Sequence, residues 1–210
     1  MAYTVDNIIQ GAAALYFGPV GSPLPTFTAG QPASETQFVT AGWKHIGFTS
    51  EGVEVEYSPE YTDVEVDQLL DAALLFKTKQ SVSVKTTLTE ATLENLLFVW
   101  GLKATALKTA GSAWDGDTLA TGESELGLDG GSLNEFPHER SLSFVGPGPR
   151  TNSLVTKERV YLLRRVLQTD ASTHGLKKAE ATTLPVSFRC LPDPSKTGSG
   201  YGVIRDRKIA

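Results

Sequence analysis

Apolar and polar side chains alternate along several segments of this 210-residue chain, and this period of two constrains the fold more than any other feature. In residues 51–57 the valines and the tyrosine fall on one face, while Glu54 and Glu56 fall on the other. Residues 80–89 and 182–190 repeat the pattern. Such alternation is typical of β-strands that bury one face and expose the other. The chain is therefore predicted to be mainly β.

Further strands are expected where β-branched and aromatic residues lie between turn residues. Residues 157–167 fit a strand, with a helix as the rival, and residues 203–209 fit a last strand or a C-terminal arm. The other candidate strands are residues 12–17, 43–48 and 139–145. A total of about seven strands indicates one domain, built as a β-sandwich or an open barrel segment.

One segment has the period of a helix instead. Leu93, Leu96, Leu97 and Trp100 are spaced as one stripe of an α-helix, and Gly101 suits the position just past its end. We expect this stripe to pack the helix against the outside of the sheet.

Stretches rich in Gly, Pro and other polar turn residues are expected to form long loops. They predict an N-terminal arm or loop at about residues 18–42, an insertion at about 102–135 and a C-terminal arm at about 192–210. Residues 68–76 fit either a helical turn or part of a long loop.

The net charge of −5 hides a strong asymmetry. Residues 1–139 hold 6 basic and 19 acidic side chains, whereas residues 140–210 hold 13 basic and 5 acidic ones. No Lys or Arg lies between Lys44 and Lys77, an interval with eight acidic residues. This distribution indicates charge complementarity within the fold or between copies, and it argues against a uniformly basic nucleic-acid binder.

The sequence lacks the motifs of an enzyme or of a cofactor site. It has no Gly-x-Ser-x-Gly elbow and no His-Glu-x-x-His motif, and its three histidines are not spaced as metal ligands. Cys190 lies on the apolar face of a predicted strand, where a thiol is a small buried hydrophobe. Asp115 and Asp117 open like a calcium loop, but Leu126 stands where that loop needs its bidentate Glu. We expect no enzymatic activity and no cofactor.

No apolar run approaches the 18 residues or so of a membrane-spanning helix, and the first residues lack the basic segment of a secretory signal. The chain is therefore expected to fold in a cytoplasm without crossing a membrane.

One region resembles a known family. Residues 53–61 read Val-Glu-Val-Glu-Tyr-Ser-Pro-Glu-Tyr, residues 64–68 read Val-Glu-Val-Asp-Gln, and the strand at 80–89 leads into Glu-Ala-Thr-Leu-Glu-Asn-Leu-Leu at 90–97. This order is similar to that of the major tail tube protein of long-tailed, siphovirus-type bacteriophages. The resemblance is strongest over residues 43–101.

The resemblance implies a β-sandwich flanked by a helix, with six copies per ring and inner sheets joined into one barrel. Stacked rings would form the tail tube through which genomic DNA passes, unbound, into the host. A barrel of even 16–18 strands encloses only a solute channel, so a chain with about seven strands must oligomerise to enclose DNA. The implied partners are further copies and the tail terminator, tape measure and distal tail proteins. The implied location is the virion tail, assembled in the bacterial cytoplasm.

The resemblance also gives roles to charged residues. A long acidic loop at about residues 57–79 would bridge to neighbouring subunits and rings, as would the two terminal arms. The side chains expected to face the lumen or a ring interface are Glu54, Glu56, Asp63, Glu65 and Asp67. DNA carries about one charge per 1.7 Å, so an acidic wall would repel it; the simpler interpretation is a solvated sheet face. Three basic residues are candidates for pairing with a neighbour's acidic loops, namely Arg159, Arg164 and Arg165.

Two alternatives remain open. Tube proteins of type VI secretion systems and of contractile injection particles have a similar architecture. A monomeric β-sandwich that binds carbohydrate or calcium is the alternative from another class, and it predicts an exposed aromatic platform around Trp43 or Trp114.

Overall fold

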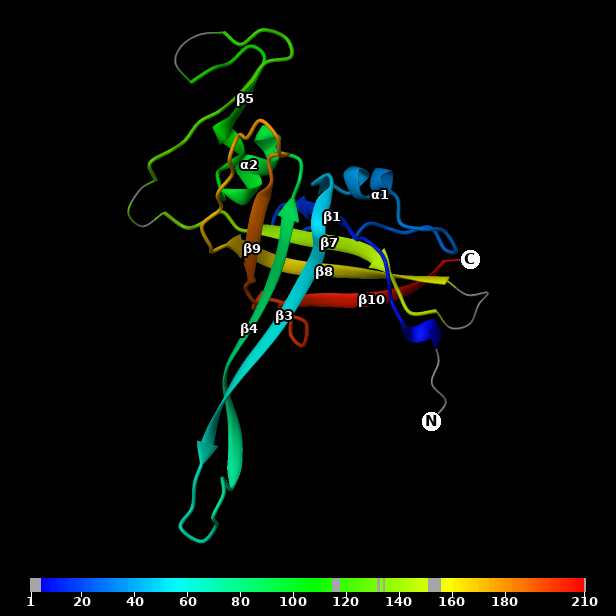
Figure 1. Cartoon of the computed structure of the whole chain (residues 1–210), viewed down its shortest axis with the longest axis vertical. Helices are drawn as coiled ribbons and strands as arrows, with labels where there is room; N and C mark the ends of the chain where they lie inside the picture. Colours follow the sequence, from blue (N-terminus) through cyan, green and yellow to red (C-terminus); the bar gives the residue numbers. More distant parts are fainter. Residues whose placement is uncertain (1–4, 115–117, 132, 134, 151–155, 210) are drawn as a thin grey trace.

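The fold is described from a computed structural model covering residues 5–114, 118–131, 133, 135–150 and 156–209 (Figure 1). It is mainly β, as predicted. The strands are β1 (Ala14–Gly18), β2 (Lys44–His45), β3 (Thr49–Val64), β4 (Leu74–Leu88), β5 (Leu107–Thr109), β6 (Ser124–Leu126), β7 (Arg140–Pro147), β8 (Thr156–Gln168), β9 (Leu184–Cys190) and β10 (Gly202–Ile209). The helices are α1 (Glu35–Thr40) and α2 (Leu93–Val99), with 3-10 turns η1 (Val5–Asn7) and η2 (Ala104–Ala106).

Eight strands form one antiparallel sheet in the order β2-β1-β7-β8-β9-β4-β3, and β10 also pairs with β8. The long strand β8 joins two parts, because its residues 156–163 pair with β10 and its residues 166–168 pair with β9. Figure 1 shows that β7, β8 and β10 run across the view, while β9, β4 and β3 run steeply along it. The sheet thus folds over on itself, which is the open barrel segment of the prediction. Strands β5 and β6 form a separate hairpin.

The main core lies where the two parts of the sheet and α2 meet. Alternate residues of β4 and β9 point into it, among them Val84 and Phe188, and Leu142 of β7 and Val166 of β8 join them. The ring of Phe98 in α2 lies 4.9 Å from that of Phe188. Burial of alternate side chains on both parts explains why the two-residue period in the sequence located these strands.

The helix α2 is present where it was predicted, but its buried face is different. Leu96 and Leu97 are buried, Leu93 is half-buried, and Trp100 lies past the helix end and is exposed. Residues 95–99 are all buried, because this helix of seven residues is covered on several sides rather than along one stripe. The assignment of Trp100 to helix packing was therefore wrong.

Residues 18–42, predicted to be an arm or a loop, fold against their own chain. They contain α1, which begins at a capping box in which the Ser34 side chain accepts from the Gln37 amide and the Gln37 side chain accepts from the Ser34 amide. Phe38 of α1 is fully buried and stacks on Tyr16 of β1, with ring centroids 3.9 Å apart, and Trp43 packs beside it. The segment covers the second face of the sheet.

A buried ion pair fastens this segment to the last strand. Arg207 of β10 pairs with Glu158 of β8, and only about a tenth or less of each side chain is exposed. Both oxygens of Glu158 accept from the Ala33 amide, at 3.1 and 2.9 Å. The Arg207 guanidinium also donates to the Thr28 carbonyl at 3.0 Å and lies 4.0 Å from the Phe27 ring centroid. Burial lowers the pKa of Arg207.

Residues 57–79 are not a loop, which corrects the sequence interpretation. Strands β3 and β4 stay paired as far as Val64 and Leu74, so only residues 65–73 form the turn of a long hairpin (Figure 1). The alternation in the sequence was followed only as far as residue 57, and Pro59 comes soon after it. β3 is an edge strand, however, and the proline is tolerated there. At the other end of the chain, residues 202–209 are a strand rather than an arm.

Candidate assembly surfaces

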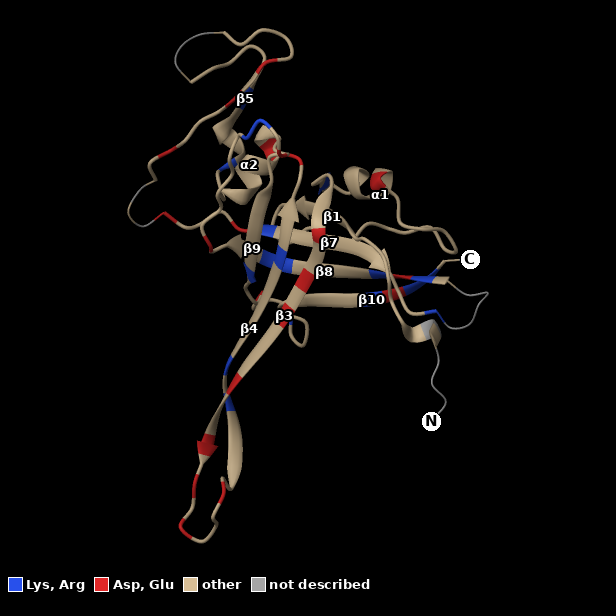
Figure 2. Cartoon of the chain, in the orientation of Figure 1, with Lys and Arg blue, Asp and Glu red and all other residues tan. Residues whose placement is uncertain are grey.

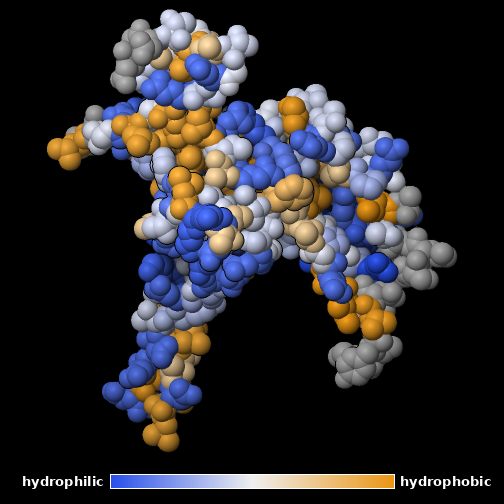
Figure 3. Space-filling model, turned by 45° about the horizontal axis from the view of Figure 1, so that its top comes forward, coloured by the Kyte–Doolittle hydropathy of each residue, from blue (hydrophilic) through white to orange (hydrophobic). Residues whose placement is uncertain are grey.

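The β3–β4 hairpin extends beyond the core and carries large apolar side chains that its own chain does not cover. Leu70 in the turn is fully exposed, and about half or more of each of six other side chains is exposed, namely Tyr57, Tyr61, Leu69, Leu74, Leu75 and Phe76. Figure 3 shows apolar residues at the end of this projection. Exposed apolar surface of this kind marks a site of protein contact.

The predicted acidic residues fall into two groups. Glu54 and Glu56 lie on the outer face of β3 near the body of the sheet, and both are exposed. Glu54 stands opposite Lys85 of β4, whose ammonium lies 3.3 Å from the Glu56 carboxylate. The outer face at this level is therefore of mixed charge rather than purely acidic.

The other group lies at the far end of the hairpin. Asp63 lies one residue before the end of β3, and Glu65, Asp67 and Asp71 lie in the turn. No Lys or Arg occurs in residues 45–76, so these four carboxylates have no basic neighbour in the turn itself. Figure 2 shows this uninterrupted acidic end of the hairpin. Sequence reasoning singled out both groups of acidic residues, but it did not show that the group near the body of the sheet lies beside a lysine whereas the group at the end of the hairpin does not.

The three predicted arginines all have partners within the chain. The Arg159 guanidinium donates to both carboxylate oxygens of Asp206, at 2.6 and 2.9 Å, which raises the pKa of Arg159 and lowers that of Asp206. Arg165 binds Glu139 in the same bidentate way, at 2.6 and 2.7 Å. Arg164 donates to the Ser199 carbonyl at 3.0 Å. Pairing of these arginines with a neighbouring copy stays a prediction, and it would have to compete with these contacts.

Four other cations lie near the end of the sheet but not on one face of it, because Arg205 and Lys208 are three residues apart on β10 and their side chains point to opposite faces. Lys157 of β8 stands opposite Lys208 of β10. Arg150 follows β7, whose end is fixed there by a hydrogen bond from the Gly148 amide to the Lys157 carbonyl. None of the four makes an ion pair with any described residue.

Besides the two-residue strand β2, two longer strands of the folded sheet have an open edge. Among the described strands, β3 pairs with β4 alone, and β10 pairs with β8 alone apart from a single bridge between Gly30 and Ile209. An open edge presents unpaired backbone donors and acceptors to another strand. Both edges are therefore available for pairing with further copies.

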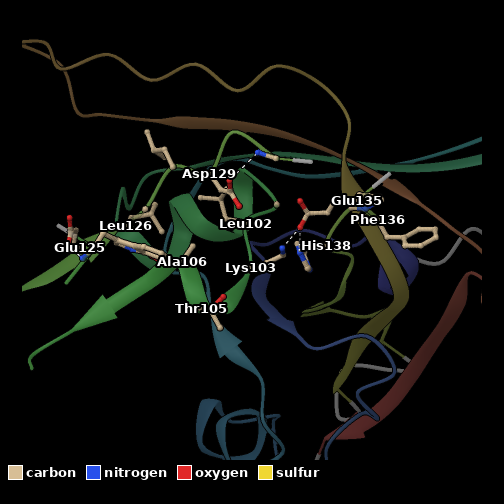
Figure 4. Close-up of a pocket in the computed structure, with 16 residues that line it drawn as sticks. Leu102, Lys103, Thr105, Ala106, Glu125, Leu126, Asp129, Glu135, Phe136 and His138 are labelled. Carbon is tan, nitrogen blue, oxygen red and sulfur yellow. Dashed lines mark hydrogen bonds and ion pairs between the residues drawn. The ribbon is translucent and has the colours of Figure 1, made fainter. Parts of the chain in front are cut away.

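A cavity of about 720 Å³ lies between the end of α2, the β5–β6 hairpin and the segment before β7 (Figure 4). Lys103 and Glu135 form an ion pair across it, and this contact raises the pKa of Lys103. His138 Nε2 lies 3.7 Å from the same carboxylate. The described lining holds no nucleophile beside a base, and the described residues hold no group of three His, Cys, Asp or Glu placed to bind a metal.

Other features of the sequence find a structural role. Cys190 is buried, and burial raises its pKa to about 12. Trp43 is also buried, which removes it as a carbohydrate platform, and the Trp114 indole donates to the Ala106 carbonyl at 3.0 Å. Asp115 and Asp117 lie outside the described residues. No helix within the described ranges has the length and apolar character needed to span a membrane.

Comparison with known proteins identifies the family. A family model described as phage tail tube protein matches residues 1–198, which is most of the chain. A comparison with curated proteins finds no match. The projecting apolar hairpin and the open strand edges suit a subunit of a larger assembly. The chain belongs to the phage tail tube protein family, whose members are structural proteins that assemble into the tube of the virion tail rather than enzymes.

Proposed function

We propose that six copies of this chain form a ring, and that stacked rings form the tail tube of a siphovirus-type phage through which DNA is ejected into the host. The observation that carries this proposal is the β3–β4 hairpin, which extends past its own core with an apolar surface that only another chain can cover. The open edges of β3 and β10 support the joining of sheets between neighbours. Assembly takes place in the host cytoplasm.

Repeated use of one contact between two different surfaces leads to closed rings or open filaments. A head-to-tail interface closes into a ring when its rotation closes, and it grows into a filament when it does not. A tube needs one contact that closes the ring and a second contact that stacks the rings. In this proposal the sheet edges form the first contact and the hairpin forms the second. Tail terminator, tape measure and distal tail proteins are the expected partners at the two ends and inside the tube.

The outer face of β3, with Glu54 and Glu56, lines the channel in this proposal. Lys85 neutralises part of this face, so each copy contributes a weakly acidic surface. A face of this kind repels the DNA backbone enough to prevent adhesion, while the neighbouring sheet supplies rigidity.

The test is a phage that carries Glu54→Lys and Glu56→Lys. Both side chains are exposed, so the variant should fold and form tubes, and it should eject DNA poorly because the channel now attracts the phosphate backbone. The matched control is Glu180→Lys, an exposed acidic residue in the loop before β9. Normal ejection by the double variant would remove Glu54 and Glu56 from the channel. A tube that binds a contractile sheath would favour the contractile alternative.

A further inference from the structure

The β3–β4 hairpin leaves the body of the molecule at a defined point. Strand β9 pairs with β4 from Leu88 only as far as Val82. Two residues further on, the Tyr201 hydroxyl donates to the Gln80 carbonyl at 3.1 Å. Beyond Gln80, β4 pairs with β3 and with no other described strand, so the sheet does not support the hairpin tip, which we define as residues 63–76. What fixes the direction of the tip therefore lies near this point, within the hairpin itself.

An irregularity in the pairing lies at the same point. Glu60 pairs with Lys79 and the next residue, Tyr61, pairs with Lys77, so Thr78 of β4 has no partner on β3. One extra residue of this kind is a β-bulge, which bends its strand and increases the local twist. Figure 1 shows the two strands crossing each other along the projection. The Thr78 bulge therefore bends the hairpin at the base of its tip.

The bulge also decides on which face of β4 the next residue lies. Strict alternation would place Lys77 on the outer face with Lys79. Because Thr78 is unpaired, Lys77 lies on the opposite face, where its ammonium donates to the Tyr57 hydroxyl and to the Gln80 amide oxygen, at 2.8 Å each. The Tyr57 hydroxyl donates to the same amide oxygen at 3.1 Å, and its hydrogen bond with Lys77 raises the pKa of Lys77. Side chains from both sides of the bulge are thus joined.

The outer face is held at the bulge as well. The Lys79 ammonium lies 2.9 Å from the Glu60 carboxylate, and the Thr78 hydroxyl donates to the Glu60 carbonyl at 3.3 Å. Exposed contacts of this kind each add little to the stability of a fold. Gathered around one bulge on both faces of the hairpin, they restrict its direction instead. We call this set of side chains the bulge clamp, and its members are Tyr57, Glu60, Lys77, Lys79 and Gln80.

We propose that the Thr78 bulge and its clamp set the direction of the hairpin tip in the monomer, before a second copy is met. This inference rests on the proposed tube, in which the tip contacts other copies, and it names the residues that position that surface. A tip already held in the direction that assembly needs loses little conformational freedom on contact. A tip that swings freely has this direction for only a fraction of the time, and the apparent affinity falls with that fraction.

The other bulge of the hairpin is a less suitable candidate. It lies between Ser50 and Val53, where the buried Thr86 donates its hydroxyl to the Gly52 carbonyl at 2.6 Å. At this level β4 is still paired with β9. A bend here shapes β3 within the body of the sheet and does not turn the tip relative to it.

Deletion of Thr78 tests the role of the bulge. Lys77 and Lys79 become neighbours, as their partners Tyr61 and Glu60 already are, so the ladder closes with every pair kept. Each side chain also keeps its face, because paired residues lie on the same side of a sheet. The variant therefore presents the same charged and apolar residues on a tip that points elsewhere. Thr78→Ser, which keeps the bulge and the hydroxyl, is the matched control.

Spin-label distances in the monomer, at a concentration too low for assembly, report the direction of the tip. The labels are carried by Leu75→Cys in the tip and by Thr36→Cys in α1, both at exposed positions. The native Cys190 is buried with a pKa of about 12, so it reacts little near neutral pH. We expect a narrow distance distribution in the unaltered protein and in Thr78→Ser, and a shifted mean after deletion of Thr78. An unchanged mean after the deletion contradicts the role of the bulge.

Loss of the clamp should loosen the tip without turning it. Tyr57→Phe with Lys77→Met removes one hydroxyl and one ammonium from exposed side chains, so this clamp variant should fold. Its distance distribution should be broader about the same mean. The control, Tyr61→Phe with Lys178→Met, removes the same two groups outside the clamp, and Tyr61 is 54% exposed, like Tyr57. Equal widths for the clamp variant and its control contradict the clamp.

Assembly is measured on the same variants without labels, by sedimentation velocity over a concentration series. Deletion of Thr78 should raise the concentration needed for assembly by about tenfold or more. The clamp variant should raise it about three- to tenfold, because its tip has the required direction for only about a third to a tenth of the time. Both controls should assemble normally. Normal assembly by a deletion variant with a shifted tip would overturn the inference.

Failure of this inference is distinguishable from failure of the proposed function. If the unaltered protein forms no rings or tubes at any concentration, the proposed function fails, whereas the distances in the monomer still decide whether the bulge directs the tip. Urea unfolding shows which variants are folded. If deletion of Thr78 prevents folding, the clamp variant decides: a narrow distribution with normal assembly would contradict the proposal, and a broad distribution with weakened assembly would support it.

Discussion

Replacement of Leu70 by serine separates the stability of the subunit from the stability of the assembly. Leu70 lies in the turn of the β3–β4 hairpin and is fully exposed, so the folded monomer gains nothing from it. We expect the free energy of unfolding to change by no more than about 0.5 kcal/mol, as for other exposed sites. In the proposed tube, however, we expect the same side chain to be buried against a neighbouring copy.

The size of the assembly effect follows from that burial. Burying a leucine side chain is worth about 1.5–3 kcal/mol, and about 1.4 kcal/mol corresponds to a tenfold change in an equilibrium constant. Each copy contributes one Leu70, so the concentration needed for assembly should rise about 10- to 100-fold. Leu176→Ser is the matched control, because Leu176 is 90% exposed in the loop before β9, away from the hairpin.

The assays are urea unfolding for the monomer and sedimentation velocity over a concentration series for the assembly. Leu70→Ser should match the unaltered protein in the first and differ strongly in the second, while Leu176→Ser should match it in both. Equal assembly by all three proteins would show that the hairpin tip stays in solvent. A large loss of monomer stability would show that Leu70 is already covered within the chain.

Three further predictions concern the fold. Phe98→Ala should lower the free energy of unfolding in urea by about 3–5 kcal/mol, and Trp100→Ala should lower it much less. Equal losses would show that Trp100 packs as the sequence predicted. Glu158→Ala should cost about 3–5 kcal/mol, because it leaves a buried guanidinium uncompensated; a small change would contradict the fastening role of this pair. Arg159 lowers the pKa of Asp206, so ionised Asp206 stabilises the fold at pH values above its unfolded pKa, and this stabilisation is lost as the pH falls through the lower folded pKa. Asp206→Asn should therefore weaken the fall in the free energy of unfolding at acidic pH. An unchanged pH dependence would show that this pair does not contribute to stability.

The alternation of side chains was sufficient to locate most of the sheet. Strand β9 and the second half of β4 bury every second residue on one core, and apart from Thr86 these buried positions are apolar. In β3 the alternation of apolar and polar residues predicted a half-buried strand, but Val55 and Tyr57, which alternate with glutamates there, are exposed. These residues lie where the hairpin leaves the core, and the hydroxyl of Tyr57 is held there by Gln80 and Lys77 rather than by the core.

The errors in the helices have separate causes. A single stripe describes a helix that packs on one surface, but α2 is covered on several sides, and Phe98 and Val99 are among its most buried residues. The helix α1 was missed although its signal is present, since Ser34 and Gln37 have the spacing of a capping box. The prolines and glycines around it favour a loop, and for this reason the helix was not predicted.

Ion pairing could not be predicted from the sequence. Arg159 and Asp206 are 47 residues apart, and Arg165 and Glu139 are 26 apart, so only the strand order brings each pair together. The charge asymmetry predicted complementarity within the fold or between copies, and of these pairs only Arg165 and Glu139 join the acidic and the basic parts of the chain. It could not separate the arginines that are engaged internally from the cations that remain at the end of the sheet.

Electron microscopy of the purified protein over a concentration series tests the central claim most directly. The account predicts rings of six copies at low concentration and stacked rings, growing into hollow tubes wide enough for DNA, at high concentration. Particles that stay monomeric at every concentration, from protein shown to be folded by its unfolding transition, would contradict it.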